Sequence, residues 1–448
     1  MSQADEAPAA SGMDDRAIAR AGATIAILSV VAKSSAFLRE AVIAMLYGRG
    51  PEVDAFFVAL ALPVFLVQIV AGSFQIAAIP ALLAAKRGGD RRRAAALATS
   101  GAGIVAGVIA GAAILCAAFA PLYLPAVAPE YSARTITLAT DMLWIMTLFA
   151  VMGGLAYAGG AVLTAERRFA LPAIAPVLTP LAMALLLIGF RDSLGVSALA
   201  WGAVIGTLAE AAIVLSAARR LGYRPAVSVS RADLADLLRR WGPLFLATLL
   251  LSGAGLIDQL MAARLGEGAA SALGYGAKLV LAGLHVVTTA LGISVLPAYA
   301  ENALEDPARL FSRLRRHLVA VILLAIPGVG IAWLLSEPVI ALLYQRGAFT
   351  AEDTKLVAQV LSAYATQLPA FAAVVILVRA AAVLNLGGVI PVAAAVNIVL
   401  TIALNALFMR YWGVVGIALA TAPAFAVTGA VLYLGILRDQ GRRKPTVS

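Results

Sequence analysis

Ionisable side chains interrupt the first long apolar segment of the chain. Lys33, Arg39 and Glu40 lie within it, and Asp54 opens the next apolar segment after a glycine- and proline-containing turn at residues 48–51. Burying an ionised side chain at membrane depth costs several kcal/mol, so such residues usually mark a polar path through a membrane protein. This stretch therefore predicts a protein that moves a polar cargo.

The helical spacing of these residues leaves more than one role open. On an ideal helix Lys33 and Glu40 share a face, whereas Arg39 points roughly 120° away from Lys33. All three line one cavity only if the helix bends. Arg39 either contacts an anionic ligand or forms a buried ion pair with Glu40 or Asp54. Asp54 either faces the cavity or merely caps its own helix.

Composition assigns the chain to the integral membrane proteins. Of its 448 residues, 62% are hydrophobic and 13% are charged, against about 25% charged in an average soluble domain. Apolar runs of about 20 residues recur from end to end and predict an all-α protein with about twelve transmembrane helices. The predicted spans run near 21–47, 54–84, 95–122, 137–165, 170–190, 195–217, 241–264, 268–297, 318–336, 356–384, 388–409 and 413–437.

The distribution of basic residues predicts the orientation of these spans. Alternate loops are rich in arginine and lysine, as at residues 86–93, 219–240 and 309–316, while the opposite loops hold isolated cations. Cytoplasmic loops of membrane proteins carry this excess, so both termini are expected to be cytoplasmic. The net charge of +10 is then a topology signal, and no nucleic-acid partner is expected.

The two halves of the chain resemble each other. Residues 38–50 align with 256–268, which pairs Glu40 with Asp258 and matches glycines at the same offsets. Each half holds six predicted spans, which predicts two six-helix bundles related by a pseudo-two-fold axis along the membrane normal. Bundles arranged in this way enclose the central cavity of many alternating-access transporters. Asp258 is expected at mid-membrane, with either a cation-coupling or an ion-pair role.

The same features divide the chain into five parts. They are a disordered cytosolic leader (1–20), an N-terminal bundle (21–217), a basic cytosolic linker (218–240), a C-terminal bundle (241–437) and a basic cytosolic tail (438–448). The leader has no apolar core and is not expected to be a signal peptide. A single cysteine, Cys116, excludes disulfides and metal–thiolate sites. No catalytic set, metal cluster or cofactor motif is found, so an enzyme is not expected.

Several motifs, in a fixed order along the chain, carry a resemblance to a known family. They are the stretch from Leu38 through Ala59 with Leu62-Pro63, Ala128-Pro129-Glu130-Tyr131, residues 168–176 (RFALPAIAP), Leu296-Pro297 and residues 343–350 (LYQRGAFT). The chain resembles the MurJ/MviN-type lipid II flippases of the MOP exporter superfamily. The resemblance implies translocation of an undecaprenyl-diphosphate-linked sugar precursor, lipid II or a related glycan, across the bacterial inner membrane by alternating access.

The functional positions of that family carry over in part. The resemblance implies that Lys33, Arg39 and Lys278 bind the diphosphate, with lysine in place of the family's arginine at two of the three positions. Glu40, Asp54 and Asp258 are the expected cavity or gating residues. The family's second-span arginines and glutamate are absent, because residues 64–73 read VFLVQIVAGS. The chain also has twelve predicted spans, whereas such flippases usually have fourteen.

Three other functions stay open. Because the chain departs from the family pattern, a flippase for another polyprenyl-linked glycan, such as an exopolysaccharide unit, is the first alternative. A cation-coupled exporter of small molecules from the same superfamily is the next alternative, although Lys33 and Arg39 suit an anionic cargo better. The last is a non-transporting membrane scaffold for cell-wall enzymes. No ATP-binding motif is present, so a coupling ion or the membrane potential would have to drive transport.

Four further ionisable residues are weaker candidates. Glu210 lies deep in the sixth span without an evident partner. His285 is either a packed core residue or a proton relay. Arg264 and Arg379 lie near span ends and are expected to extend their charged groups toward water.

Overall fold

The computed structural model describes residues 15–224, 230–284, 307–384, 386 and 388–443. Within these residues every regular element is helical, and seven continuous segments are long and apolar enough to cross a membrane. Two of the seven, Ala170–Arg220 and Val389–Asp439, each hold two predicted spans. Together with α1, α9 and the helix Ala269–Leu284, the described residues match the twelve predicted spans, which confirms the predicted fold class.

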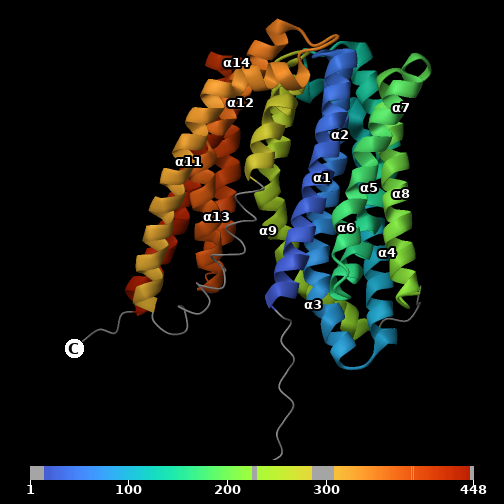
Figure 1. The fold of residues 1–448 in the computed structure, drawn as a ribbon, viewed down its shortest axis with the longest axis vertical. Helices are drawn as coiled ribbons and strands as arrows, with labels where there is room; N and C mark the ends of the chain where they lie inside the picture. The colour runs from blue at the N-terminus through green and yellow to red at the C-terminus, as the bar shows by residue number, and fades with distance from the viewer. Residues whose placement is uncertain (1–14, 225–229, 285–306, 385, 387, 444–448) are drawn as a thin grey trace, which may run out of the picture.

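The first bundle contains the helices of the N-terminal half (Figure 1). Its elements are α1 (Asp15–Tyr47), α2 (Pro51–Leu66), the π-helix η1 (Val67–Gly72), α3 (Ser73–Arg87), α4 (Arg91–Val127), α5 (Ala133–Ala165), α6 (Ala170–Ile174), η2 (Ala175–Val177), α7 (Leu178–Leu194), η3 (Gly195–Ser197) and α8 (Ala198–Arg220). Helix α5 lies at the centre of the bundle, where it packs against α2, α4 and α8.

The second bundle contains the helices of the C-terminal half. Its elements are α9 (Arg231–Ala263), the helix Ala269–Leu284, α11 (Pro307–Tyr344), α12 (Ala351–Ala365), α13 (Leu368–Val383) and α14 (Val389–Arg443). Gly413 breaks α14 into two spans, because its φ of 54° and ψ of −134° are not helical. The two bundles meet at the upper end of Figure 1, where α1 ends and α12 begins, and they diverge toward the lower end.

Helix ends in this fold are set by local sequence. Pro51 stands in the first turn of α2, where its missing N–H removes no helical hydrogen bond. Thr350 and Asp353 form a reciprocal capping box at the start of α12. Ser132 caps α5 by accepting a hydrogen bond from the Thr135 N–H. These caps fix the turns at the upper end, where the two bundles meet.

Small residues let helices of the first bundle approach closely. A Cβ atom at Gly202 would lie 2.5 Å from the Cα atom of Met183, and one at Gly206 would lie 2.5 Å from the Cα atom of Thr179. Because neither glycine has a side chain, the backbones of α7 and α8 can touch, as is common at helix interfaces in membranes. This packing positions Met183 beside α1.

Helix α9 contacts both bundles. Near its start, the Trp241 indole N–H donates a 2.8 Å hydrogen bond to the Ser73 hydroxyl, and the indole ring packs edge-on against Phe74. Farther along, α9 packs against α14 of the second bundle. Ser73 directly follows the π-helical segment η1, so α9 is fastened to the first bundle at the point where the second span is irregular.

Candidate substrate cavity

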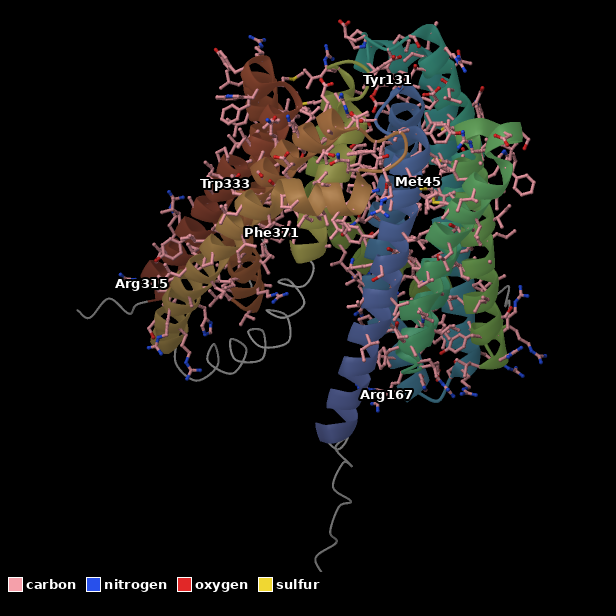
Figure 2. All side chains as sticks on the ribbon, turned by 45° about the horizontal axis from the view of Figure 1, so that its top comes forward. Met45, Tyr131, Arg167, Arg315, Trp333 and Phe371 are labelled. Atoms are coloured by element: carbon pink, nitrogen blue, oxygen red, sulfur yellow. The ribbon has the colours of Figure 1, made fainter. Side chains whose placement is uncertain are left out.

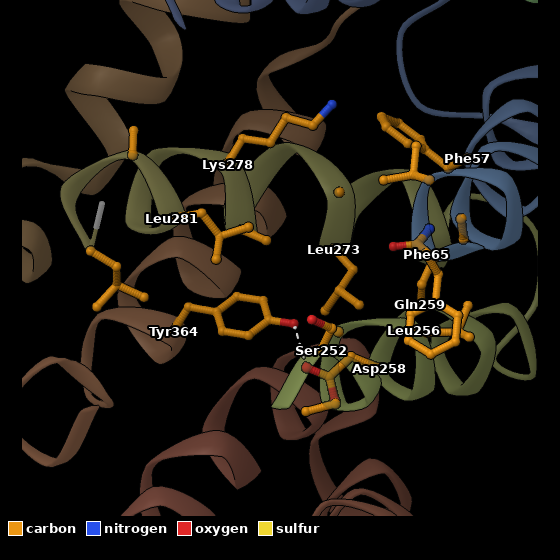
Figure 3. A pocket seen from close by; sticks show the side chains of 18 of the residues that line it. Phe57, Phe65, Ser252, Leu256, Asp258, Gln259, Leu273, Lys278, Leu281 and Tyr364 are labelled. Carbon is orange, nitrogen blue, oxygen red and sulfur yellow. Dashed lines mark hydrogen bonds between the residues drawn. The ribbon is translucent and has the colours of Figure 1, made fainter. Parts of the chain in front are cut away.

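A cavity of about 740 Å³ lies between the two bundles. Its lining residues come from α1, α2, η1, α9, the helix Ala269–Leu284, α12, α13 and α14. Five of the six predicted site residues line it: Lys33, Arg39, Glu40, Asp258 and Lys278. Figure 3 shows Lys278 and Asp258 on two different helices of the second bundle, with Leu273 between them.

Glu40 joins the two bundles inside this cavity. Its side chain is fully buried, and one carboxylate oxygen accepts hydrogen bonds from both Arg39 of α1 and Lys278 of the helix Ala269–Leu284. The Lys278 ammonium also lies 4.7 Å from the centre of the Phe57 ring, a cation–π distance. The ion-pair alternative for Arg39 is therefore present in the structure, with Glu40 and not with Asp54 as its partner.

The cationic cluster has unused hydrogen-bonding capacity. Within the described part of the chain, the Arg39 Nε atom and the second carboxylate oxygen of Glu40 have no hydrogen-bond partner. The Arg39 guanidinium also lies 3.5 Å from the Met183 sulfur, a weak acceptor. Lys33 lines the same cavity. On an ideal helix Arg39 points away from Lys33, but the cavity follows a broad arc of α1 and includes both residues.

Asp258 lies in a separate polar part of the cavity wall. Its carboxylate accepts a 2.7 Å hydrogen bond from the Asn405 amide and a 3.1 Å hydrogen bond from the Tyr364 hydroxyl (Figure 3). Both partners are neutral, so these contacts of Asp258 are hydrogen bonds and not an ion pair. The carbonyl oxygen of Asn405 is buried without a hydrogen-bond partner among the described residues. Several oxygen ligands, one of them anionic, thus converge at this point.

Asp54 lies outside the cavity and contacts the other bundle directly. It accepts hydrogen bonds of 2.6 and 2.7 Å from the backbone N–H groups of Gly268 and Ser271, and one of 3.1 Å from the Tyr131 hydroxyl. The N-cap residue of its own helix is Gly50. Asp54 therefore caps the helix Ala269–Leu284, which belongs to the second bundle.

Further contacts fasten the two bundles at the upper end. Arg49 forms a 2.9 Å ion pair with Asp353 of α12, and the Ala348 N–H donates a 2.9 Å hydrogen bond to the Met45 carbonyl. The Tyr275 hydroxyl donates a 3.1 Å hydrogen bond to the Gly48 carbonyl. Figure 2 labels Met45 in the region where these bundles meet. All these contacts lie between the cavity and the upper surface.

Glu267 adds a contact at the upper surface itself. Its carboxylate accepts a 2.6 Å hydrogen bond from the Thr135 hydroxyl and a 3.1 Å hydrogen bond from the Ser132 N–H, both at the start of α5. The hydrogen bond from Thr135, supported by that from Ser132, lowers the pKa of Glu267 below its usual value. The position of a carboxylate at a helix N-terminus is favourable in itself.

Three of the four weaker candidates are described by the structure, and none of the three lines the cavity. Glu210 accepts a 3.3 Å hydrogen bond from Thr179, and Arg264 donates one of 3.3 Å to the Ala126 carbonyl near the upper end. Arg379 lies on α13. His285 lies outside the described residues.

Sequence reasoning missed the two partners of Asp258 and one ion pair between the bundles. Asn405 and Tyr364 are neutral side chains with no motif around them, and only the fold brings them to Asp258. The Arg49–Asp353 pair joins residues 304 positions apart. A signal did exist for Asp353, because the Thr-x-x-Asp capping box at 350–353 predicts a helix start there.

Comparisons with known proteins agree with this geometry. The family model of the lipid II flippase MurJ matches residues 43–446. A probable lipid II flippase MurJ of Synechocystis is 29% identical over 430 residues, covering 92% of this chain and 80% of that protein. The lipid II flippase MurJ of Burkholderia cenocepacia is 26% identical over 440 residues, covering 95% of this chain and 85% of that protein.

Solved structures share the fold. A lipid II flippase MurJ in an inward closed conformation superposes with a TM-score of 0.77 at 21% identity, covering 93% of this chain and 87% of that one. An inward-facing multidrug resistance MATE transporter of the MOP superfamily superposes with a TM-score of 0.73 at 16% identity, covering 94% and 96% of the two chains. Because the family model matches most of this chain, the chain belongs to the MurJ family of lipid II flippases, a family of multi-pass membrane proteins.

Proposed function

We propose that this protein moves the head group of a polyprenyl-diphosphate-linked glycan, lipid II or a close relative, from the inner to the outer leaflet of a bacterial inner membrane. The doubly anionic diphosphate crosses inside the cavity, while the prenyl tail stays in lipid. Bare hydrocarbon would oppose the crossing strongly, because an ionised group at the bilayer centre is costly.

The observation that carries this proposal is the convergence of Lys33, Arg39 and Lys278 on one cavity between the bundles. Arginine can hold two phosphate oxygens at once, and lysine adds a mobile point charge. Of these residues, Arg39 and Lys278 share the single carboxylate of Glu40. With Lys33 included, three cations line the cavity together with the two carboxylates of Glu40 and Asp258, which leaves a surplus of one positive charge for a diphosphate.

Alternating access follows from the same cluster. The Glu40–Lys278 contact links the two bundles beneath the contacts at the upper end. A diphosphate that binds Lys278 competes with Glu40 for the ammonium, and this competition weakens one link between the bundles. The upper contacts, which include Asp54 with Gly268 and Arg49 with Asp353, would then open while the lower end closes.

The proposed orientation places the upper end outside the cell. The basic residues at 86–93, 219–224 and 230–240 follow α3 and α8 and lie at the opposite end, which the positive-inside rule assigns to the cytoplasm. Both termini are then cytoplasmic, and the moving units are the bundles 21–217 and 241–437. The start of α9, from Arg231 to Trp241, travels with the first bundle because Trp241 is bonded to Ser73.

Asp258 is the residue proposed to take a coupling cation. Hard cations such as Na⁺ prefer oxygen ligands from carboxylates, amide carbonyls and hydroxyls. The carboxylate of Asp258 belongs to that chemistry, as does the carbonyl oxygen of Asn405, which has no hydrogen-bond partner among the residues that the structure describes. Thr421 also lines the cavity, and its hydroxyl donates a hydrogen bond to the Ala418 carbonyl of its own helix.

A related glycan is the second candidate. Val67 and Gln68 stand where the family pattern has two arginines, and Gln68 lines the cavity as an uncharged amide. The cavity of this chain therefore holds fewer cations on η1 than the family pattern predicts. This composition supports an exopolysaccharide unit as an alternative cargo.

Growth of cells depleted of their own lipid II flippase tests the proposal. The wild-type chain is expected to restore growth. Arg39→Ala should reduce the export of lipid-linked glycan about tenfold or more, since hydrogen bonds to charged groups contribute about 1.5–3 kcal/mol. Arg39→Lys should keep part of the activity, and Arg134→Ala, on the exposed first turn of α5, should keep all of it.

Two outcomes would change the assignment. If Arg39→Ala were fully active at normal protein levels, the assignment of Arg39 to a diphosphate site would be wrong. Failure to restore growth, combined with rescue of a strain that lacks an exopolysaccharide flippase, would identify the alternative cargo.

A further inference from the structure

A second pocket lies on the second bundle, away from the cavity. It has a volume of about 430 Å³ and lies between α11, α12 and the part of α14 that follows Gly413. Trp333 forms one wall, and Figure 2 shows this residue on the flank of the second bundle that faces away from the first. The pocket therefore plays no part in the cargo path described above.

Two opposite charges line this pocket. They are Glu337 of α11 and Lys355 of α12, and both side chains are exposed. Neither forms an ion pair within the described part of the chain. Unpaired charges on a membrane-facing surface are uncommon unless they meet a polar partner. The partner expected here therefore has both a positively charged group, for Glu337, and a negatively charged group, for Lys355.

The depth of the pocket matches the head-group region of the bilayer. Glu337 lies seven residues before Tyr344, the end of α11, and Lys355 lies four residues after Ala351, the start of α12. At 1.5 Å per residue these positions are about 10 Å and about 6 Å below the upper ends of their helices. Tryptophan is enriched at the same level of the bilayer, as Trp333 is here.

An apolar surface for acyl chains continues below the pocket. Leu323, Leu324, Ile331 and Leu334 of α11 are between 57% and 80% exposed. The most apolar window of this helix is only 6% buried within the protein. A lipid whose head group occupied the pocket would lay its acyl chains along this face.

The pocket wall is also fixed in shape. The Trp333 indole N–H donates a 3.0 Å hydrogen bond to the Ser362 carbonyl of α12, which holds the ring across the two helices. Gln359 and Thr366 add uncharged donors and acceptors to the lining. These groups suit the phosphate and glycerol ester oxygens of a phospholipid.

We propose that this pocket binds the head group of a zwitterionic aminophospholipid of the outer leaflet, with the amine at Glu337 and the phosphate at Lys355. The leaflet assignment rests on the orientation proposed above, whereas the binding chemistry does not. An anionic phospholipid without an amine fits less well, because Glu337 would face a group of the same sign. Occupation of the pocket would brace α11 against α12.

Native mass spectrometry of the purified, delipidated protein tests this site. Phosphatidylethanolamine and phosphatidylglycerol with identical acyl chains are titrated separately. The wild-type protein is expected to bind phosphatidylethanolamine more tightly. Glu337→Gln should weaken phosphatidylethanolamine binding about fivefold, the upper range for an exposed ion pair, and leave phosphatidylglycerol binding unchanged or stronger. Lys355→Met should weaken both lipids.

Glu352→Gln is the matched control, since Glu352 is an exposed acid on the first turn of α12 that does not line the pocket. It should bind both lipids as the wild type does. A photoactivatable phosphatidylethanolamine should label residues between 333 and 366, which requires no variant. Equal binding of the two lipids, labelling elsewhere, or lipid-independent dimerisation through α11 would overturn the proposal.

This test is separate from that of the flippase function. Arg39→Ala is expected to lose transport and keep phosphatidylethanolamine binding, because Arg39 lies in the cavity and not in this pocket. A protein that transports normally and shows no lipid preference would reject the lipid site alone.

Discussion

Glu40 is the residue on which the cavity's electrostatics depend. It is fully buried, and it holds Arg39 of its own helix and Lys278 of the other bundle with one carboxylate oxygen. Removing one partner from a buried ion pair leaves an uncompensated charge, which typically costs about 3–5 kcal/mol. In this protein the removal of Glu40 would leave two adjacent cations, which is the arrangement a diphosphate neutralises.

Glu40→Gln is therefore expected to lower thermal stability and to make stability depend on a diphosphate. Without ligand the variant should unfold at a lower temperature than the wild type. Pyrophosphate should raise the unfolding temperature of the variant more than that of the wild type, because it replaces the missing negative charge. Thermal unfolding of the detergent-solubilised protein with and without pyrophosphate measures both effects.

Asp258→Asn provides the control for this prediction. It removes a carboxylate from the same cavity, but from a position where the hydrogen-bond donors are the neutral side chains of Asn405 and Tyr364. Pyrophosphate should raise the unfolding temperature of Asp258→Asn no more than it raises that of the wild type. An equal response of the two variants would show that pyrophosphate does not act at the Glu40 cluster.

For individual residues, the sequence predicted which charged side chains matter better than it predicted their partners. Lys33, Arg39, Glu40 and Lys278 stand out because ionised groups are rare in apolar segments, and the structure places all four at one cavity. The role of Asp54 was harder to predict, since it caps a helix whose first residues lie 214 positions away. Short-range patterns carry no information about such a partner.

The turns at the upper end are the elements that hold the bundles together. Gly48 follows α1, and Gly347 follows α11, each with a φ of 62°. A Cβ atom at Gly48 would lie 2.4 Å from the Ala348 carbonyl oxygen, and one at Gly347 would lie 2.2 Å from the Met45 carbonyl oxygen. The two turns therefore touch through their backbones, and only glycine fits either position.

Gly48→Ala and Gly347→Ala are each expected to open the upper end. The added methyl group meets backbone atoms of the other bundle, so the contact must separate, and the conformational equilibrium shifts toward the state in which the cavity faces the upper side. Distances between spin labels placed on the upper ends of α5 and α12 measure the shift. Transport should fall because one of the two states is disfavoured.

Gly195→Ala separates this effect from simple backbone strain. Gly195 has a φ of 57°, but a Cβ atom there would meet nothing within 4 Å. All three positions have a positive φ, which disfavours alanine in each case. If Gly195→Ala changed the label distances as much as Gly48→Ala did, the contact between the turns would not be the cause.

The internal repeat predicted these turns only in part. Gly48 and Gly266 align in sequence, and both have positive φ values, of 62° and 95°. Gly50 and Gly268 also align, but Gly268 has a φ of 92° while Gly50 is extended with a φ of −173°. The difference has a physical reason, because Gly268 offers its N–H to Asp54 and Gly50 is the N-cap residue of α2. The π-helical segment η1 had no sequence signal.

For the whole molecule, hydrophobic run lengths and the repeat predicted twelve helices in two bundles. That success has a simple cause, since every membrane-crossing segment must satisfy its backbone hydrogen bonds internally and must be long enough to span the bilayer. The conformation could not be predicted in the same way. Alternative states of a transporter differ by a few kcal/mol, and the deciding contacts, such as Arg49 with Asp353, are individually small.

A cross-link at the upper end tests whether these contacts must break during transport. Met45 and Ala348 are joined by a 2.9 Å backbone hydrogen bond between the bundles, and residues paired in this way have Cα atoms close enough for a disulfide. In a Cys116→Ala background, Met45→Cys with Ala348→Cys should form a disulfide that stops glycan export. A reducing agent should restore export, because it releases the two bundles.

Thr179→Cys with Thr207→Cys is the matched control, since these hydroxyls lie 3.0 Å apart on α7 and α8 of one bundle. Its disulfide should leave export unchanged, because alternating access moves each bundle as a unit. Continued export with the Met45–Ala348 disulfide fully formed would mean that the upper end stays closed throughout the cycle. The cargo would then have to leave by a route other than the space between the two bundles.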